Sequence, residues 1–377
     1  MGKRVMVLIG TRKGTFIAES DASRKDWHIR GPMAGGMVTY EEMTFPQQLV
    51  TMDVNFDPKT QTLFAATAGS GGNGIYEGAQ ATAIRRSTDL GETWTASSEG
   101  LTYGEGGPDI LKVWNVQPTN HGVIYAGVEP AGLFKSTDDG ATWQHVEGLT
   151  NHPSRKDWGG GNGGLCLHSI VVHPNDPNRI WVGTSAAGGF YSADGGVSWD
   201  PTNKNVRNFD VPAKEDEVSG CVHKLRGVFN GTDLLYQQNH FGVYRSADAG
   251  KNWQEVSEGL SSDFGFGMAV HPHDTKSIYV IPLQGDGRYM PEGKAAVWRS
   301  RDGGDNWTRQ DKGLPQQGAF VGVLREGMAS DTLDDAGIYF GTNTGEVFVS
   351  PDGGDSWSLV AGYLPSVLAV ETAVIDN

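Results

Sequence analysis

Both cysteines of the chain stand two residues before a histidine. Cys166 precedes His168, and Cys221 precedes His223. Residues two apart on a strand share a face, so each pair can approach one metal ion. Two thiolates and two imidazoles would suit Zn or Cu. The alternative is that each cysteine is a small buried hydrophobe and each histidine makes a local hydrogen bond.

Acid and base chemistry is a second possibility that the residue types allow. If Glu129 and Glu371 face each other, they form the paired carboxylates that glycosidic cleavage needs, one as acid and one as base or nucleophile. Lys112 could hold an anionic group or shift a carboxyl pKa. His240, like the two histidines named above, could carry protons.

Further polar and aromatic residues fall in segments predicted as loops, where binding residues are often found. The basic residues could hold an anionic group of a substrate, and the aromatic ones could stack on a sugar or aromatic ring. The candidates for substrate contact are Arg12, Lys13, Tyr103, Trp158 and Tyr289.

The elements that must position these residues follow from a repeated phrase: Ser, one residue, Asp, one residue, Gly, two residues and Trp. It occurs six times, at 87–94, 136–143, 192–199, 246–253, 300–307 and 350–357. Ser20 to Trp27 keeps the spacing with Ala22 and Arg24 at the Asp and Gly positions, and is a decayed seventh copy. From Ser to Ser the intervals are 67, 49, 56, 54, 54 and 50 residues. These intervals predict an all-β, seven-bladed β-propeller of four-stranded antiparallel blades.

Each copy of the phrase is typical of a turn between the third and fourth strands of a blade. The Asp can accept hydrogen bonds from the amides of its own turn, and the Gly can take a positive φ. The first strand of blade one is missing at the N-terminus, and Val367 to Ile375 can supply it and close the ring. We therefore expect one domain over 1–377, with blade one shared between 1–30 and 366–377.

Aligning the innermost strands by their apolar residues predicts where a site would lie. The aligned set has one position per blade, on the face opposite the repeated turns, and five of its seven members are polar. A polar cluster at the channel mouth is a candidate site, and the alternative is a rim that merely solvates a channel. Glu129, Lys13, Arg12 and His240 are expected on the same rim. From blade one to blade seven the aligned positions are Glu371, Thr51, Lys112, His168, His223, Phe266 and Val321.

The repeated phrase resembles the Asp-box, or BNR repeat, of sialidases and related β-propellers, over nearly the whole chain. In that family the boxes are structural and lie opposite the active site, so the resemblance implies no catalytic role for them. The segment Gly10 to Gly14 is similar to the start of bacterial BNR-repeat proteins described as glycosyl hydrolase-like, which implies a hydrolase. Sialidases carry an ArgXaaPro motif, but Arg30 to Pro32 follows the decayed box in a different part of the blade. A classical sialidase is therefore not expected.

Composition limits the function classes. The chain has 54 Gly and 11 Trp among 377 residues and only 20% charged residues, as a turn-rich all-β protein does. Its net charge of -15 argues against a nucleic-acid or anionic-membrane partner. The absence of a long apolar stretch or a signal-peptide pattern predicts a cytoplasmic protein without a membrane segment. Two cysteines agree with a reducing compartment.

Three function classes are compatible with these residues. The leading one is a hydrolase or lyase that acts on a small or carbohydrate-like substrate at the channel mouth. The second is a protein that binds Zn or Cu through the cysteine and histidine pairs, with no other cofactor expected. The third is a non-catalytic scaffold, similar to the propeller factors that assist photosystem assembly.

Overall fold

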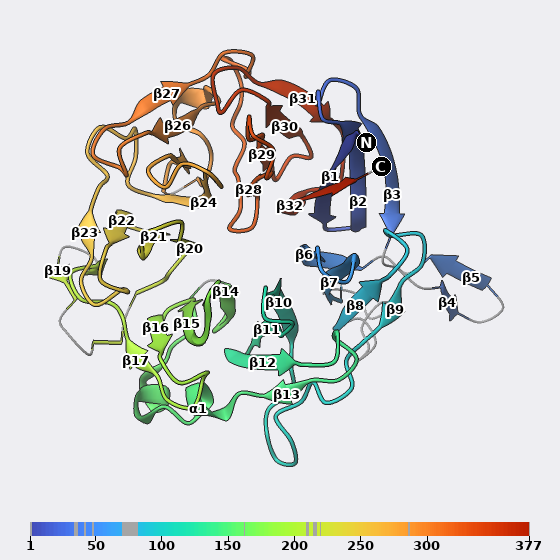
Figure 1. Ribbon diagram of the computed structural model, residues 1–377, viewed down its shortest axis with the longest axis vertical. Helices are drawn as coiled ribbons and strands as arrows, with labels where there is room; N and C mark the ends of the chain where they lie inside the picture. The colour runs from blue at the N-terminus through green and yellow to red at the C-terminus, as the bar shows by residue number, and fades with distance from the viewer. Residues whose placement is uncertain are drawn as a thin grey trace.

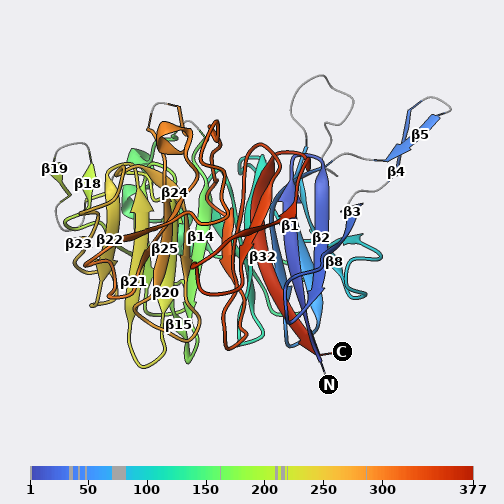
Figure 2. The ribbon, with the colours of Figure 1, turned by 90° about the horizontal axis from the view of Figure 1, so that it is seen from above.

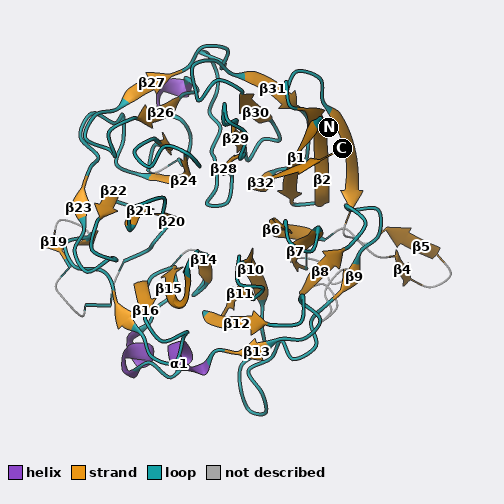
Figure 3. Ribbon diagram, in the orientation of Figure 1, coloured by secondary structure: helices purple, strands orange, loops and turns teal. Residues whose placement is uncertain are grey.

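Seven four-stranded antiparallel sheets form a ring in the computed structural model of the chain (Figure 1). The structure describes residues 2–33, 49–69, 82–161, 163–208, 213, 217–218, 220–285 and 287–376, and the backbone alone of 37–40, 43–46 and 211–212. Colouring by secondary structure shows strands throughout the ring (Figure 3). The chain is thus a seven-bladed β-propeller, as its repeats predict.

Each blade runs outward from an innermost strand at the channel to an outermost strand at the rim of the ring. In that order, blade one is β32 (Val367–Asp376), β1 (Lys3–Thr11), β2 (Gly14–Asp21) and β3 (His28–Met33). Blade two is β6 (Val50–Asp57), β7 (Thr62–Ala68), β8 (Ala83–Ser87) and β9 (Thr95–Ala96). Blade three is β10 (Lys112–Pro118), β11 (Ile124–Glu129), β12 (Gly132–Ser136) and β13 (Gln144–His145). Blade four is β14 (Leu167–His173), β15 (Asp176–Thr184), β16 (Gly188–Ser192) and β17 (Asp200–Pro201).

The last three blades follow the same order. Blade five is β20 (Lys224–Val228), β21 (Leu234–Asn239), β22 (Gly242–Ser246) and β23 (Gln254–Glu255). Blade six is β24 (Gly265–Val270), β25 (Ile278–Pro282), β26 (Val297–Ser300) and β27 (Thr308–Gln310). Blade seven is β28 (Met328–Ser330), β29 (Ile338–Gly341), β30 (Val347–Ser350) and β31 (Ser358–Ala361).

A few elements lie outside the blades. They are the hairpins β4 (Met37–Tyr40) with β5 (Met43–Pro46) and β18 (Arg207–Asn208) with β19 (Val211–Pro212), the helix α1 (Glu147–Thr150), and two short 3₁₀ turns, Pro153–Asp157 and Pro291–Gly293. Among the described residues, no helix is both long and apolar enough to cross a membrane.

The two ends of the chain close the ring. β32 pairs antiparallel with β1 from Lys3 opposite Asp376 to Thr11 opposite Val367, which confirms the predicted closure. In β1 seven consecutive residues, 5–11, are buried, because neighbouring blades cover both faces of the strand. The two termini consequently lie side by side at one face of the disc (Figure 2). We call this the lower face and the opposite one the upper face.

The repeated phrase forms the lower turn that joins the third and fourth strands of a blade. In blade three, Asp138 accepts the Thr142 N–H at 2.9 Å and the Ser136 hydroxyl at 2.7 Å. These and the related hydrogen bonds, that from the Thr142 N–H first, lower the pKa of Asp138 to about 2. The indole N–H of Trp143 donates to the carbonyl oxygen of Ser97 in blade two at 2.8 Å. The turn therefore ties its own strands together and ties the blade to its neighbour.

The decayed copy in blade one replaces the usual turn contacts with a buried ion pair. Arg24, at the Gly position, has a φ of 55° and donates to both carboxylate oxygens of Asp331, at 2.7 and 2.6 Å. Its side chain is 4% exposed and that of Asp331 is fully buried. Asp331 also accepts the Tyr339 hydroxyl at 2.7 Å and the Leu333 N–H at 3.1 Å. The pair joins blade one to blade seven beside the ring closure.

Replacing Asp331 by Ala should lower the free energy of unfolding by about 3–5 kcal/mol, because the Arg24 guanidinium would stay buried without a partner. Urea denaturation would measure the loss. The control is Glu92→Ala, which removes the exposed partner of Arg30 and should change stability little. Equal stability of the two variants would contradict a structural role for the buried pair.

Candidate functional site

Irregularities in the innermost strands select the side chains that meet near the upper face. The pairing register shifts between Thr51 and Asp53, between Val113 and Asn115, between Leu167 and Ser169, and between Val367 and Ala369. A bulge of this kind leaves one residue out of the ladder and re-aims its side chain. The residues left out are Met52, Trp114, His168 and Leu368, and all four line one cavity.

This upper cavity has a volume of about 510 Å³. It is bounded by the ends of innermost and second strands, by the β1–β2 turn and by loops that lead into innermost strands, and thus lies opposite the repeated turns. Its lining residues are Arg12, Val50, Met52, Ala68, Gly69, Lys112, Trp114, Glu129, Gly163, Gly164, His168, Leu324, Arg325, Glu326 and Leu368.

Glu129 is held at the cavity wall by two donors from the neighbouring strand. It lies opposite Lys112 in the β10–β11 pairing, and the Lys112 Nζ is 2.9 Å from its Oε2. The bulged Trp114 donates its indole N–H to the same oxygen, also at 2.9 Å. Gly164 has a φ of +89° and passes so close to Oε1 that a Cβ there would clash with the carboxylate. The strand register that places Lys112, the bulge that places Trp114 and the close approach of Gly164 together fix the position of this carboxylate.

A second carboxylate of the cavity, Glu326, belongs to a buried charged cluster. Its Oε2 is ion-paired with Lys224 across the ring, from blade seven to blade five. Asp53 accepts the Asn115 amide N–H at 2.8 Å and the Val116 N–H at 3.0 Å. Burial, and then the charge of Glu326, raise the pKa of Asp53 well above its usual value. Asp53 therefore holds its proton far above the pH at which an exposed carboxyl ionises.

Three buried polar atoms on residues that line the cavity have no hydrogen-bond partner among the described residues. They are Nε2 of His168, Nε of Arg325 and Oε1 of Glu326. Native proteins pair almost all buried polar atoms, so three orphans around one cavity are unusual. Burial keeps His168 neutral by lowering its pKa well below the usual value. The wall of the cavity therefore contains a neutral imidazole, a guanidinium and a carboxylate, each with one polar atom buried without a hydrogen-bond partner.

The structure does not bring the two cysteine and histidine pairs together as one set of ligands. His223 is paired through Nδ1 with the Gly265 carbonyl oxygen at 2.7 Å, whereas Nδ1 of His168 lies 3.2 Å from the Ser169 hydroxyl. Burial raises the pKa of the Cys166 thiol to about 12, and Cys221 lies 3.6 Å from the Ser185 hydroxyl. In the part of the chain that the structure describes, no three His, Cys, Asp or Glu side chains gather as they would around a metal ion.

Glu371 lies away from Glu129, at a second cavity. That lower cavity, of about 320 Å³, contains Glu371 and Arg226 and is bounded by the loops that leave the innermost strands. The bulge of β32 places Leu368, rather than Glu371, at the position equivalent to His168. The carboxylate that shares the upper cavity with Glu129 is therefore Glu326.

The alignment of blade seven also needs correction. Its innermost strand begins at Met328, so Val321 falls in the preceding loop. The sequence carries a signal for the right register, since Gly-Met-Ala occurs at 267–269 in blade six and at 327–329 in blade seven. This match aligns Phe266 with Glu326 and places Arg325 beside it, two residues that the apolar alignment misses.

The other predicted contact residues divide between the cavity and the protein interior. Arg12 lines the cavity and Lys13 is exposed in the same turn. Tyr103 packs on Phe134 and donates its hydroxyl proton to a backbone carbonyl, so it is a packing residue. Trp158 is likewise buried, with its indole N–H bonded to the Ser154 hydroxyl at 2.9 Å. Tyr289 stacks edge-on against the exposed Phe320 and does not line the cavity.

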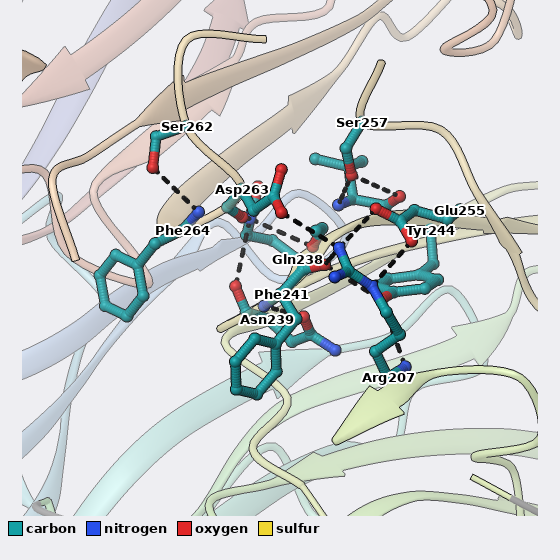
Figure 4. A network of polar contacts seen from close by, with 12 residues as sticks. Arg207, Gln238, Asn239, Phe241, Tyr244, Glu255, Ser257, Ser262, Asp263 and Phe264 are labelled. Atoms are coloured by element: carbon teal, nitrogen blue, oxygen red, sulfur yellow. Dashed lines mark hydrogen bonds and ion pairs between the residues drawn. The ribbon is translucent and has the colours of Figure 1, made fainter. Parts of the chain in front are cut away.

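His240 lies in the β21–β22 turn, next to His223, with ring centroids 4.5 Å apart. A network around Arg207 fixes this turn (Figure 4). Arg207 donates to the Phe241 carbonyl at 2.5 Å, to Glu255 at 2.7 Å and to Asp263 at 3.1 Å. Several hydrogen bonds therefore hold this turn, and burial lowers the pKa of His240.

Arg30, from the ArgXaaPro sequence, lies on β3 and pairs with Glu19 at 2.9 Å, outside the cavity.

No family model matches the chain. Among curated proteins, a xyloglucanase of Paenibacillus sp is 27% identical over 246 residues, which are 60% of this chain and 23% of that protein. A sialidase of Bacteroides fragilis is 28% identical over 214 residues, 46% of this chain and 37% of that protein. The chain thus spans about a quarter to two fifths of these relatives' length.

Solved structures share the fold. The GH74 enzyme of Niastella koreensis superposes with a TM-score of 0.60 at 19% identity, covering 97% of this chain and 51% of that one. YCF48 bound to a D1 peptide superposes with a TM-score of 0.53 at 16% identity, covering 88% of this chain and 86% of that one. The chain is therefore similar in fold to glycoside hydrolase propellers and to a peptide-bound propeller.

Two buried histidines, His168 and His223, should make the free energy of unfolding depend on pH below 6.5. Their pKa values are lowered by burial, so between the unfolded value of about 6.5 and the folded value only the unfolded chain takes up the protons. Each histidine then costs about 1.4 kcal/mol of stability per pH unit as the pH falls. Burial raises the pKa of Asp53 and Glu371, which act with the opposite sign, so a variant must isolate the effect.

The variant is His168→Gln, compared with the native chain by urea denaturation between pH 7 and pH 4.5. The native chain should lose stability relative to the variant as the pH falls. His28→Gln, at an exposed position on β3, is the matched control and should leave the pH dependence unchanged. A constant difference between native chain and His168→Gln over this range would contradict the neutral buried imidazole.

Proposed function

We propose that the chain is a carbohydrate-acting hydrolase whose active site is the upper cavity. The observation that carries the proposal is that two carboxylates, Glu129 and Glu326, line that one cavity beside apolar surface. The similarity to xyloglucanases supports a carbohydrate as the substrate.

The shape and the lining of the cavity suit a sugar. Its volume of about 510 Å³ lies within the usual range for small-molecule sites. Trp114, Met52 and Leu368 offer apolar surface for the faces of sugar rings, and charged groups stand beside them. This mixture of apolar surface and a few placed polar groups is typical of specific ligand sites.

Glu129 and Glu326 are the two carboxylates that hydrolysis of a glycosidic bond requires. Lys112 and Trp114 stabilise the negative charge of Glu129, which therefore serves as the base or nucleophile. Glu326 delivers to the leaving oxygen a proton that it takes from Lys224, its ion-pair partner, whose pKa burial lowers. Overall, one water molecule is consumed, its hydroxyl going to the anomeric carbon and its proton to the leaving oxygen.

Glu129→Gln and Glu326→Gln should each lower kcat on xyloglucan oligosaccharides by about 100-fold or more, because each removes an acid or base group. Release of reducing ends would measure the rate. Glu371→Gln is the matched control, a channel carboxylate outside the upper cavity, and should retain turnover. Unchanged rates in the first two variants, with turnover by the native chain, would contradict the assignment.

A second candidate function is the binding of a polypeptide segment at the upper face. The superposition with YCF48 covers 88% of this chain and 86% of YCF48, so the two are similar in extent. The superposition with the GH74 enzyme covers only 51% of that enzyme. This difference favours the second candidate. Binding of peptides from an array, together with no binding or turnover of oligosaccharides, would favour this candidate over hydrolysis.

A further inference from the structure

We infer that the substrate of the upper cavity carries a carboxylate group, as a uronic acid does, and that Arg325 binds it. The inference rests on the proposed function for the choice of a sugar. It goes beyond that function by assigning a charge to the substrate and a receptor for that charge.

The Arg325 guanidinium lies near two aromatic rings that come from opposite parts of the propeller. Its Cζ is 5.9 Å from the ring centre of Trp114 in blade three and 5.0 Å from that of Phe266 in blade six. The polar contact of its Nη2 is the Ser185 hydroxyl at 3.5 Å, at the limit of a hydrogen bond. Its Nε is buried and has no partner in the described part of the chain.

Among the described residues this guanidinium has no ion-pair partner, although the charge of the adjacent Glu326 acts on it. Glu129 is ion-paired with Lys112, and Glu326 is ion-paired with Lys224. Among the described residues, no carboxylate lies within 4 Å of Arg325, although the chain as a whole has a net charge of -15. The nearby thiol of Cys166 stays protonated, since burial raises its pKa to about 12. The mouth therefore holds an excess positive charge in an acidic protein.

Arg325 is partly exposed, with its Nε buried. A partly buried charge without an ion-pair partner carries a desolvation cost, and a bound anion would offset that cost. A guanidinium presents a planar fork of N–H donors that matches the two oxygens of a carboxylate. A singly charged carboxylate fits better than a dianion, because Glu129 and Glu326 line the same cavity and would repel the extra charge.

The test compares an oligosaccharide that ends in glucuronate with the same oligosaccharide after its carboxyl group has been reduced to the alcohol. Isothermal titration calorimetry would measure the binding of both to the native chain, to Arg325→Gln and to Arg288→Gln. Arg288 is the matched control because it also stacks on Phe266, at 5.5 Å, but does not line the cavity.

The native chain and Arg288→Gln should bind the acidic oligosaccharide at least tenfold more tightly than the reduced one, and Arg325→Gln should bind both alike. The melting temperature of unliganded Arg325→Gln should not fall below that of Arg288→Gln, because the substitution removes a partly buried charge that has no ion-pair partner. A fall of that temperature would indicate a purely structural arginine and overturn the inference.

The outcomes separate this inference from the proposed function. Equal binding and turnover of both oligosaccharides by the native chain would overturn the carboxylate inference and leave the hydrolase proposal standing. Binding of the acidic oligosaccharide that depends on Arg325, without turnover, would support the receptor and contradict the hydrolase. Absence of both binding and turnover would overturn both.

Discussion

The pairing of β32 with β1 is the interaction on which the rest of the structure depends. It joins residues from the two ends of the chain over the full length of a strand. Blade one is therefore complete only when both ends are in place. With the ring closed, neighbouring blades cover both faces of β1, and the upper ends of several innermost strands surround one cavity.

The closed ring also explains why charged groups are buried at its centre. Lys224 in blade five meets Glu326 in blade seven, although blade six separates them in the ring. Arg226 likewise donates to the Met328 carbonyl oxygen at 3.2 Å. These contacts cross the channel instead of following the blades. They place Glu326 and its neighbour Arg325 at the mouth, where the chemistry of the cavity is concentrated.

The sequence predicts the architecture well because the repeated turn is local. The hydrogen bonds of Asp138 all lie within four residues, so the phrase can be recognised without knowledge of the rest of the chain. The same repeat predicts the number of blades, the closing strand and the face on which a cavity lies. Glu129, Lys112, His168 and Arg12 follow from the repeat in this way. The Gly-Met-Ala match of blades six and seven could also have indicated Arg325 and Glu326. Met52, Trp114 and Leu368, by contrast, depend on bulges that no local sequence pattern predicts. A bulge adds one residue to an innermost strand, and apolar alignment across blades then slips, as for Glu371 in β32. The pairing of Lys224 with Glu326 spans 102 residues and follows from the curvature of the ring alone.

The bulged residues have a consequence for how such a protein can diversify. Met52, Trp114, His168 and Leu368 stand outside the ladders that hold their blades together. A substitution at one of them changes the wall of the cavity and leaves the strand pairing of its blade intact. Each of these four blades can thus supply a different side chain to the wall of a common cavity, one mutation at a time. A protein of seven similar blades can in this way acquire an asymmetric cavity whose ligand specificity changes through single substitutions.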